Sequence, residues 1–164
     1  MTVKPGIYAA SMSCFNKDLS LDIDSTILHA EKLLKEGCHG VVLFGSTGAG
    51  QLIAKHEKEK LIEKISNSKL KDHFLIGTSD NSLRETTELM KHCIKNQINK
   101  FLIMPPAYYK YGDSETYRFF SNIIQRVPES EIILYNFEKL SGYKFSTQIV
   151  EKLVKDFSKQ RDRF

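Results

Sequence analysis

The sequence predicts a parallel α/β domain, because short continuous apolar runs alternate with amphipathic helical segments along its whole length. The apolar runs are Ile7–Ala10, Val41–Phe44, Phe74–Ile76, Phe101–Met104 and Ile132–Tyr135. Runs of this kind are typical of strands buried on both faces, as in parallel sheets. Strands that alternate with helices indicate right-handed crossover connections in one sheet.

The composition is that of an ordinary globular protein. The chain has 164 residues, of which 41% are hydrophobic and 27% charged, and we expect a single domain over residues 1–164. It has no apolar run of about 18 residues and no signal-peptide pattern near its start, which favours a cytoplasmic protein without a membrane span. Its three cysteines are widely spaced, so we expect reduced thiols and no metal site.

The net charge of +4 is modest, and acidic residues are interleaved with the basic ones. Between Lys55 and Lys64, lysines alternate with glutamates, as on a solvated helix face. No basic stripe with stacking aromatic residues is present. We therefore expect no nucleic-acid partner.

The segments after the apolar runs have apolar residues three or four positions apart, as amphipathic helices do. The stripes are Ile23, Ile27, Ala30 and Leu34; Ile53, Leu61, Ile62 and Ile65; Leu83, Thr87, Met90 and Ile94; Tyr117, Phe120, Ile124 and Val127; and Ile149, Val150, Leu153, Val154 and Phe157. Ser82 and Ser146 are expected N-caps, and the residues 113–114 begin the fourth helix. Gly37 and Pro128 follow predicted helix ends.

Two architectures fit five strand–helix units. Five units of this length complete a flavodoxin-like sheet. They also correspond to the first five of the eight units of a (β/α)8 barrel, which needs about 250 residues. Periodicity alone does not separate the two.

In either architecture the functional residues gather at the carboxyl ends of the strands. Those ends are Ser11 and Ser13, Gly45–Gly48, Thr78 and Ser79, Pro105–Tyr109, and Tyr135 with Asn136. The set is rich in hydroxyl groups and poor in charge. It contains no carboxylate pair, histidine cluster or metal-ligand spacing.

The turn Gly45–Gly50 is the most informative local feature. It is not a P-loop, because Gln51 and Leu52 occupy the positions of the required lysine and hydroxyl residue. Two hydroxyls and free N–H groups ahead of a helix suit a small anion such as a carboxylate. The alternative is an ordinary turn in which Ser46 and Thr47 only satisfy the local backbone.

The tyrosines at the strand ends also have two interpretations. Tyr135 ends a strand and is either a core residue with its hydroxyl at the rim or a group that faces a site. Tyr108 and Tyr109 follow two prolines and suit packing, a subunit contact or a substrate wall.

Several short motifs occur together in one order. They are Gly6–Ala10, Gly40–Gly48 with Glu57 and Leu61, Met104–Tyr109, Tyr135–Asn136 and Leu140–Gly142. On these motifs the chain resembles, over residues 6–157, the dihydrodipicolinate synthase / N-acetylneuraminate lyase family of pyruvate-dependent lyases and aldolases. The resemblance implies a TIM (β/α)8 barrel truncated here to about five βα units, rather than a flavodoxin-like sheet.

The resemblance also implies roles for particular residues. The family forms a Schiff base between a lysine and pyruvate, without a cofactor. Ser46 and Thr47 match the pair that holds the pyruvate carboxylate, and Tyr135 matches the tyrosine that relays protons. Tyr108 matches the tyrosine that one subunit supplies to another, so a homo-oligomer, either a dimer or a tetramer, is expected.

Three positions depart from the family pattern. Glu138 replaces a usual proline, and Ala49 replaces a usual glutamate after the turn. Leu140 occupies the position where dihydrodipicolinate synthases carry an arginine for the second substrate. The Gly-Ser-Thr-Gly and Leu-Ser-Gly segments look more like the lyase branch, so the aldehyde partner is left open.

The family's Schiff-base lysine lies on strand six, which the strand spacing predicts near residue 160. Arginines stand at positions 161 and 163, after only three in the preceding 160 residues. We therefore expect that the reading frame is lost after Gln160 and that the chain is an inactive fragment with two unpaired sheet edges, prone to oligomerise or aggregate. The alternative is a non-catalytic half-barrel that oligomerises or binds a small carboxylate.

Overall fold

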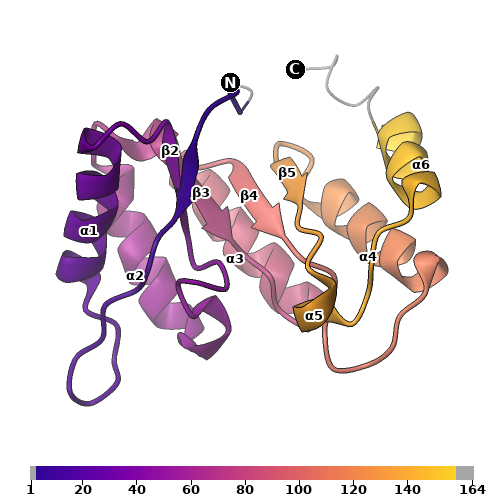
Figure 1. Cartoon of the computed structure of the whole chain (residues 1–164), viewed down its shortest axis with the longest axis horizontal. Helices are drawn as coiled ribbons and strands as arrows, with labels where there is room; N and C mark the ends of the chain where they lie inside the picture. Colours follow the sequence, from indigo (N-terminus) through magenta and orange to yellow (C-terminus); the bar gives the residue numbers. More distant parts are fainter. Residues whose placement is uncertain (1–2, 158–164) are drawn as a thin grey trace.

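The computed structural model describes residues 3–157 as a five-stranded parallel sheet with its crossover helices (Figure 1). The strands are β1 (Tyr8–Ala10), β2 (Gly40–Leu43), β3 (Phe74–Gly77), β4 (Lys100–Ile103) and β5 (Glu131–Leu134). The helices are α1 (Ile23–Lys35), α2 (Lys55–Ser66), α3 (Leu83–Lys95), α4 (Asp113–Arg126), α5 (Glu138–Ser141) and α6 (Thr147–Phe157), with 3-10 turns η1 (Gly50–Leu52) and η2 (Lys71–His73). All five predicted strands are confirmed to within one residue at each end. The predicted strand near residue 160 lies outside the described residues.

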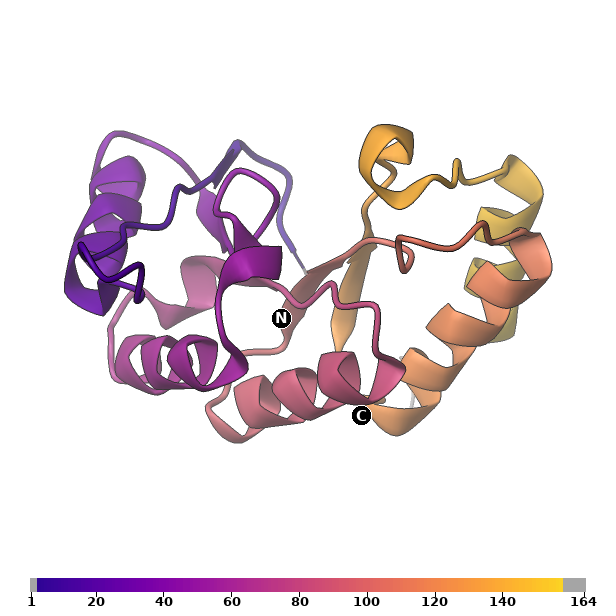
Figure 2. The ribbon, with the colours of Figure 1, turned by 90° about the horizontal axis from the view of Figure 1, so that it is seen from below.

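The strands pair in the order β1-β2-β3-β4-β5. A flavodoxin-like sheet has the order 2-1-3-4-5, so the structure excludes that alternative. Because every right-handed crossover advances in the same direction, the long helices lie in an arc along one side of the sheet (Figure 2). The result is part of a (β/α)8 barrel.

The two edges of this sheet are open, as predicted. Within residues 3–157, β1 pairs only with β2 and β5 only with β4. At the amino ends of the strands, the N–H of Val3 donates a hydrogen bond of 2.5 Å to Oε1 of Glu131. The N-terminal segment therefore reaches from the first strand to the last.

The core lies between the sheet and the helices. Every residue of β2 and β3 is buried, whereas every residue of β5 is only half-buried because this strand lies at an edge. The largest fully buried side chains include Phe74, Phe101 and Phe120. Burying an aromatic side chain of this kind contributes roughly 1.5–3 kcal/mol.

The predicted caps of two helices are present. The hydroxyl of Ser82 accepts a hydrogen bond from the N–H of Glu85, and that of Ser146 accepts one from Ile149. Val154, predicted to face the core, is instead 60% exposed, because α6 buries Ile149 and Leu153 on its other face. Ile7, in the first apolar run, is also exposed, at 68%, and β1 lies at an open edge of the sheet. Helix α5 has four residues, too few to show a helical period, and was not predicted. None of the helices in residues 3–157 has the length and apolar character needed to cross a bilayer.

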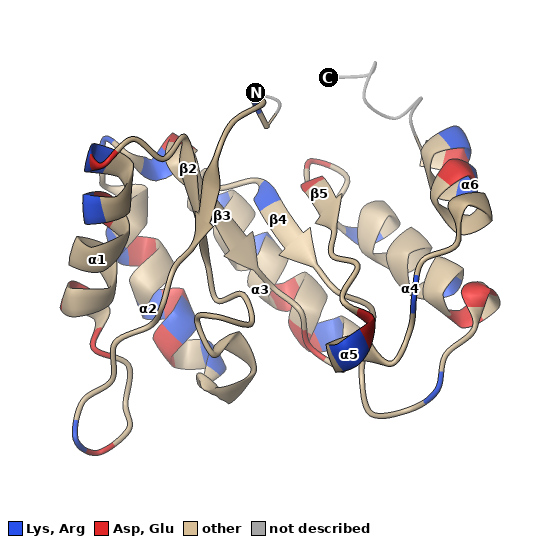
Figure 3. Cartoon of the chain, viewed as in Figure 1, with Lys and Arg blue, Asp and Glu red and all other residues tan. Residues whose placement is uncertain are grey.

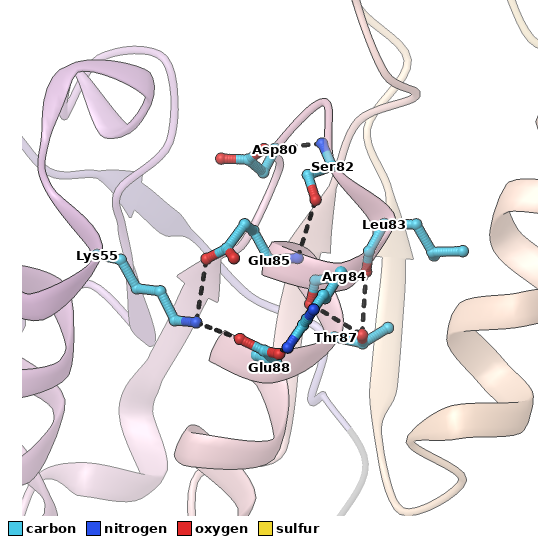
Figure 4. Close-up of polar contacts among 8 residues, drawn as sticks. All are labelled: Lys55, Asp80, Ser82, Leu83, Arg84, Glu85, Thr87 and Glu88. Carbon is cyan, nitrogen blue, oxygen red and sulfur yellow. Dashed lines mark hydrogen bonds and ion pairs between the residues drawn. The ribbon is translucent and has the colours of Figure 1, made fainter.

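Charged residues of both signs are interleaved along the outer helices (Figure 3). One cluster joins α2 to α3: Nζ of Lys55 lies 3.0 Å from a carboxylate oxygen of Glu85 and 2.6 Å from one of Glu88 (Figure 4). Arg84 adds a contact of 2.8 Å from Nε to Glu88. The hydrogen bonds from Arg84 and Lys55 lower the pKa of Glu88 to about 2.

A tight packing constraint fixes the turn after β2. Phe44 has a left-handed backbone, with φ of +60°, and its carbonyl oxygen lies against Gly50 and Gly77. A Cβ atom at either glycine would overlap this oxygen, so only glycine fits there. The end of β3 and the start of η1 therefore close around the backbone of Phe44.

We expect the substitution Gly77→Ala to lower the free energy of unfolding by about 1–3 kcal/mol, because the added methyl group overlaps the backbone carbonyl of Phe44. Urea unfolding measures this change. The matched control is Gly45→Ala, whose added methyl meets only Val42 Cγ1, at an ordinary 3.7 Å. Equal unfolding midpoints for the two variants would contradict the packing constraint.

The charge cluster predicts a pH dependence. Because the pKa of Glu88 falls from 4.5 to about 2 on folding, its ion pairs stabilise the native state above pH 4.5, and this stabilisation is lost as the pH falls toward 2. Glu88→Gln removes this contribution and flattens that part of the curve of unfolding free energy against pH. Glu151→Gln, at an exposed helical glutamate with no ion pair in the described residues, is the control. Parallel curves for wild type and Glu88→Gln would rule the mechanism out.

Candidate functional site

The carboxyl ends of β2 and β5 converge on one hydrogen bond. Ser46 lies in the turn after β2, and Tyr135 directly follows β5. The hydroxyl oxygens of these two residues are 3.0 Å apart, although 89 positions separate them in the sequence. The structure thus brings together two residues that the sequence predicted as site residues.

Main-chain and side-chain hydrogen bonds hold the turn. The N–H of Gly50 donates to the carbonyl of Gly45 at 3.2 Å, and the hydroxyl of Ser13 donates to the carbonyl of Gly48 at 2.6 Å. Ser46 and Thr47 are both exposed, and the Thr47 hydroxyl makes no hydrogen bond within residues 3–157. Both hydroxyls are therefore accessible to a ligand.

Tyr135 is held by its backbone and by its neighbours. Its N–H donates to the carbonyl of Ile103 at 2.8 Å, which continues the register of β5 beside β4. Its ring centroid lies 5.7 Å from that of Phe137. Tyr135, Met104, Gly45 and Ser46 are among the residues that line a cavity of about 40 Å³. Among residues 3–157, its polar lining consists of the hydroxyl residues Ser46, Ser79 and Tyr135 and the amide of Gln51.

Gln51 has a role that the sequence did not indicate. Its side-chain amide donates to the carbonyl oxygen of Ser79, and the Ser79 hydroxyl accepts from the N–H of Met104 at 2.8 Å. These bonds tie the turn after β2 to the ends of β3 and β4. In the sequence, this position showed only that the lysine of a P-loop was missing.

A second cavity of about 140 Å³ adjoins the first, and Gln51, Ser79 and Met104 line both. Asp80, Asn81 and Leu140 complete part of its wall, and Leu140 is 46% exposed. None of the lysines or arginines in the described part of the chain lines this cavity.

Tyr108 lies apart from this pair of hydroxyls. It is 87% exposed and has a left-handed backbone, with φ of +78°. Its ring meets that of Tyr109 edge to face, with centroids 4.9 Å apart. Among the described residues, it makes no hydrogen bond to Ser46 or Tyr135. The structure of this chain therefore leaves Tyr108 on the surface.

Comparison with known proteins identifies the family. The family model described as "Dihydrodipicolinate synthetase family" matches residues 4–159. The chain is 31% identical over 144 residues to an L-threo-3-deoxy-hexylosonate aldolase from Aspergillus niger, which covers 82% of this chain and 43% of that enzyme. The chain spans about half the length of the curated relatives that it matches.

Solved structures agree on the fold. Dihydrodipicolinate synthase from Agrobacterium tumefaciens superposes with a TM-score of 0.88 at 26% identity, covering 94% of this chain and 55% of that one. YagE, an E. coli prophage protein of the same family solved in complex with pyruvate, superposes with a TM-score of 0.85 at 25% identity, covering 96% and 53%. These neighbours are TIM-barrel enzymes, which confirms the predicted fold class. This chain belongs to the dihydrodipicolinate synthetase family.

Proposed function

We propose that this chain provides the pyruvate-binding part of a carbon–carbon lyase or aldolase that acts through a lysine Schiff base, as a dihydrodipicolinate synthase-like or N-acetylneuraminate lyase-like enzyme does. Membership of a family of lyases and aldolases supports this proposal. The single observation that carries it is the contact of 3.0 Å between the hydroxyls of Ser46 and Tyr135. This contact joins an anion-binding turn to a group that can transfer protons.

In this proposal, the turn binds the carboxylate of pyruvate. The exposed hydroxyls of Ser46 and Thr47 donate hydrogen bonds to the two carboxylate oxygens, and N–H groups of the turn add further donors. Hydrogen bonds to a charged acceptor are each worth roughly 1.5–3 kcal/mol. A fixed carboxylate places the keto carbon of pyruvate at a set distance from Tyr135.

Tyr135 is assigned the proton transfers. When an amine adds to the keto carbon, the former carbonyl oxygen must leave as water and therefore needs a proton. The phenol of Tyr135, 3.0 Å from the Ser46 hydroxyl, donates this proton, and the resulting phenolate takes up the proton that is released in the next step. Loss of a methyl proton then gives the enamine, whose carbon attacks an aldehyde; cleavage is the reverse.

Tyr108 is proposed to act across a subunit interface in a dimer or tetramer. Its ring is exposed and edge-packed on Tyr109, so it is available to a second copy of the chain. A left-handed backbone in a non-glycine residue costs about 1–3 kcal/mol and often marks a functional position.

The Schiff-base lysine is proposed to lie outside this chain. Of the lysines that the structure describes, none lines the cavity between Ser46 and Tyr135. Lys100 begins β4, at the opposite end of the sheet, and Lys139 lies on α5. We therefore expect the chain alone to bind pyruvate without forming a covalent adduct.

The adjoining cavity favours a neutral aldehyde as the second substrate. Its wall includes Gln51, Asn81, Asp80 and Leu140 and, within residues 3–157, no basic side chain. A carboxylate on the aldehyde would find no cation there and would meet the carboxylate of Asp80, whereas hydroxyl groups would find an amide and a carboxylate to bond.

A second candidate function is a non-catalytic half-barrel module that binds a small carboxylate or oligomerises. The open edges of β1 and β5 in the described structure favour it. The two candidates share the carboxylate turn and differ in whether a lysine joins it in the intact protein.

Pyruvate titration followed by amide NMR tests the carboxylate turn. Ser46→Ala and Thr47→Val should each weaken binding about tenfold, because each removes one hydrogen bond to a charged acceptor. Ser114→Ala, at an exposed serine in the first turn of α4, should leave binding unchanged. Equal affinities for all three variants would show that pyruvate does not bind at this turn.

Borohydride reduction in the presence of pyruvate, followed by mass spectrometry, tests the position of the lysine. We expect no stable adduct on the chain alone, and a reduced adduct when the matching polypeptide, extended as far as the full-length relatives, is treated in the same way. A reduced adduct on a lysine of residues 3–157 would contradict the proposed position. No adduct on the extended polypeptide would favour the non-catalytic module.

A further inference from the structure

A separate cavity lies at the opposite end of the sheet from Ser46 and Tyr135. It has a volume of about 340 Å³, which is within the usual range for small-molecule sites. It is enclosed by η2, the C-terminal end of α3, the start of β4 and the turn between α4 and β5. The proposed pyruvate chemistry uses none of these residues.

The floor of this cavity is apolar. Phe74 and Ile98 line it and are 1% and 2% exposed, and the half-buried Ile94 lies beside them. The accessible apolar surface is that of Ile94, with Phe74 and Ile98 fixed in the core behind it, and an apolar group of a ligand would be removed from water there.

Two lysines at the rim have only neutral partners. Nζ of Lys71 donates to the amide oxygen of Gln97 at 2.5 Å, and Nζ of Lys100 donates to the backbone carbonyl of Asp72 at 2.6 Å. Glu131, the partner of Lys100 in the strand register, instead accepts the hydrogen bond from Val3. Within residues 3–157, neither lysine forms an ion pair with a carboxylate. Both ammonium groups can therefore receive an anionic group of a ligand.

Two carboxylates line the same cavity. Asp72 and Glu129 are exposed, and neither takes part in an ion pair within the described part of the chain. A purely anionic ligand would meet their repulsion, and a purely cationic one would meet that of the two lysines. A molecule with both charges satisfies both sets of groups.

From these observations we propose that the cavity binds a free amino acid with an apolar side chain. Its carboxylate lies between Lys71 and Lys100, its ammonium group faces Asp72 and Glu129, and its side chain covers the apolar floor. The site is independent of the proposed pyruvate-binding turn, so either proposal can fail without the other.

Isothermal titration and amide NMR of the 164-residue chain test this proposal with L-leucine as the probe. Two analogues separate the charges: 4-methylpentanoate lacks the amino group, and 3-methylbutylamine lacks the carboxylate. We expect each analogue to bind at least tenfold more weakly than L-leucine, and the shifted amides to fall within residues 71–74 and 94–100. Saturation with pyruvate should leave the affinity for L-leucine unchanged. An analogue that binds as tightly as L-leucine, or shifts centred on residues 45–48, would overturn the proposal.

Variants test the charged groups. Lys100→Met should weaken L-leucine binding about tenfold, whereas Lys69→Met, at an exposed lysine in the same turn as Lys71 but outside the cavity lining, should not. Glu129→Gln removes an exposed charge without disturbing a strand and should also weaken binding, so the test holds even if Lys100→Met fails to fold. Wild-type affinity in Glu129→Gln, or no binding of L-leucine by the wild type, would refute the site.

Discussion

The order in which the strands pair determines the rest of this structure. Each strand lies beside the next one in the sequence, so each crossover helix is placed on the same side of the sheet and the sheet curves away from the helices. The curvature brings the carboxyl ends of the strands toward one axis. The hydroxyls of Ser46 and Tyr135 therefore meet, although the two residues are on strands that do not pair.

Steric packing refines this arrangement at the turn after β2. The left-handed backbone of Phe44 turns the chain sharply. Its carbonyl oxygen packs against Gly50 and Gly77 so closely that a Cβ atom at either position would overlap it. The amide of Gln51 then joins the turn to the end of β3. The exposed hydroxyls of Ser46 and Thr47 therefore belong to a turn whose backbone is fixed by the packing around Phe44 and by the hydrogen bond of Gln51. A rigid support of this kind is what a binding site for a small anion requires.

The sequence predicted the strands well because each is a continuous apolar run between glycine, proline or polar residues, and a parallel sheet buries such runs on both faces. A barrel and a flavodoxin-like sheet differ in which strands pair with each other, and the spacing of apolar residues along the chain does not show this. Only the motifs taken together favoured the barrel. Val154 was wrongly predicted to be buried, because α6 buries only the side of the helix that carries Ile149 and Leu153. Gln51 and Phe44 were not identified as important because their roles depend on contacts with β3, and no local pattern encodes those contacts.

The hydrogen bond between Val3 and Glu131 has a consequence for the order of folding. Neighbouring strands pair across about thirty residues, as Tyr8 with Gly40 and Lys100 with Glu131 do, so the sheet can grow one unit at a time from local loops. The Val3 contact instead closes a loop of 128 residues, and its entropy cost falls only when all five strands are in place. We therefore expect this contact to form late, after the intermediate units have formed.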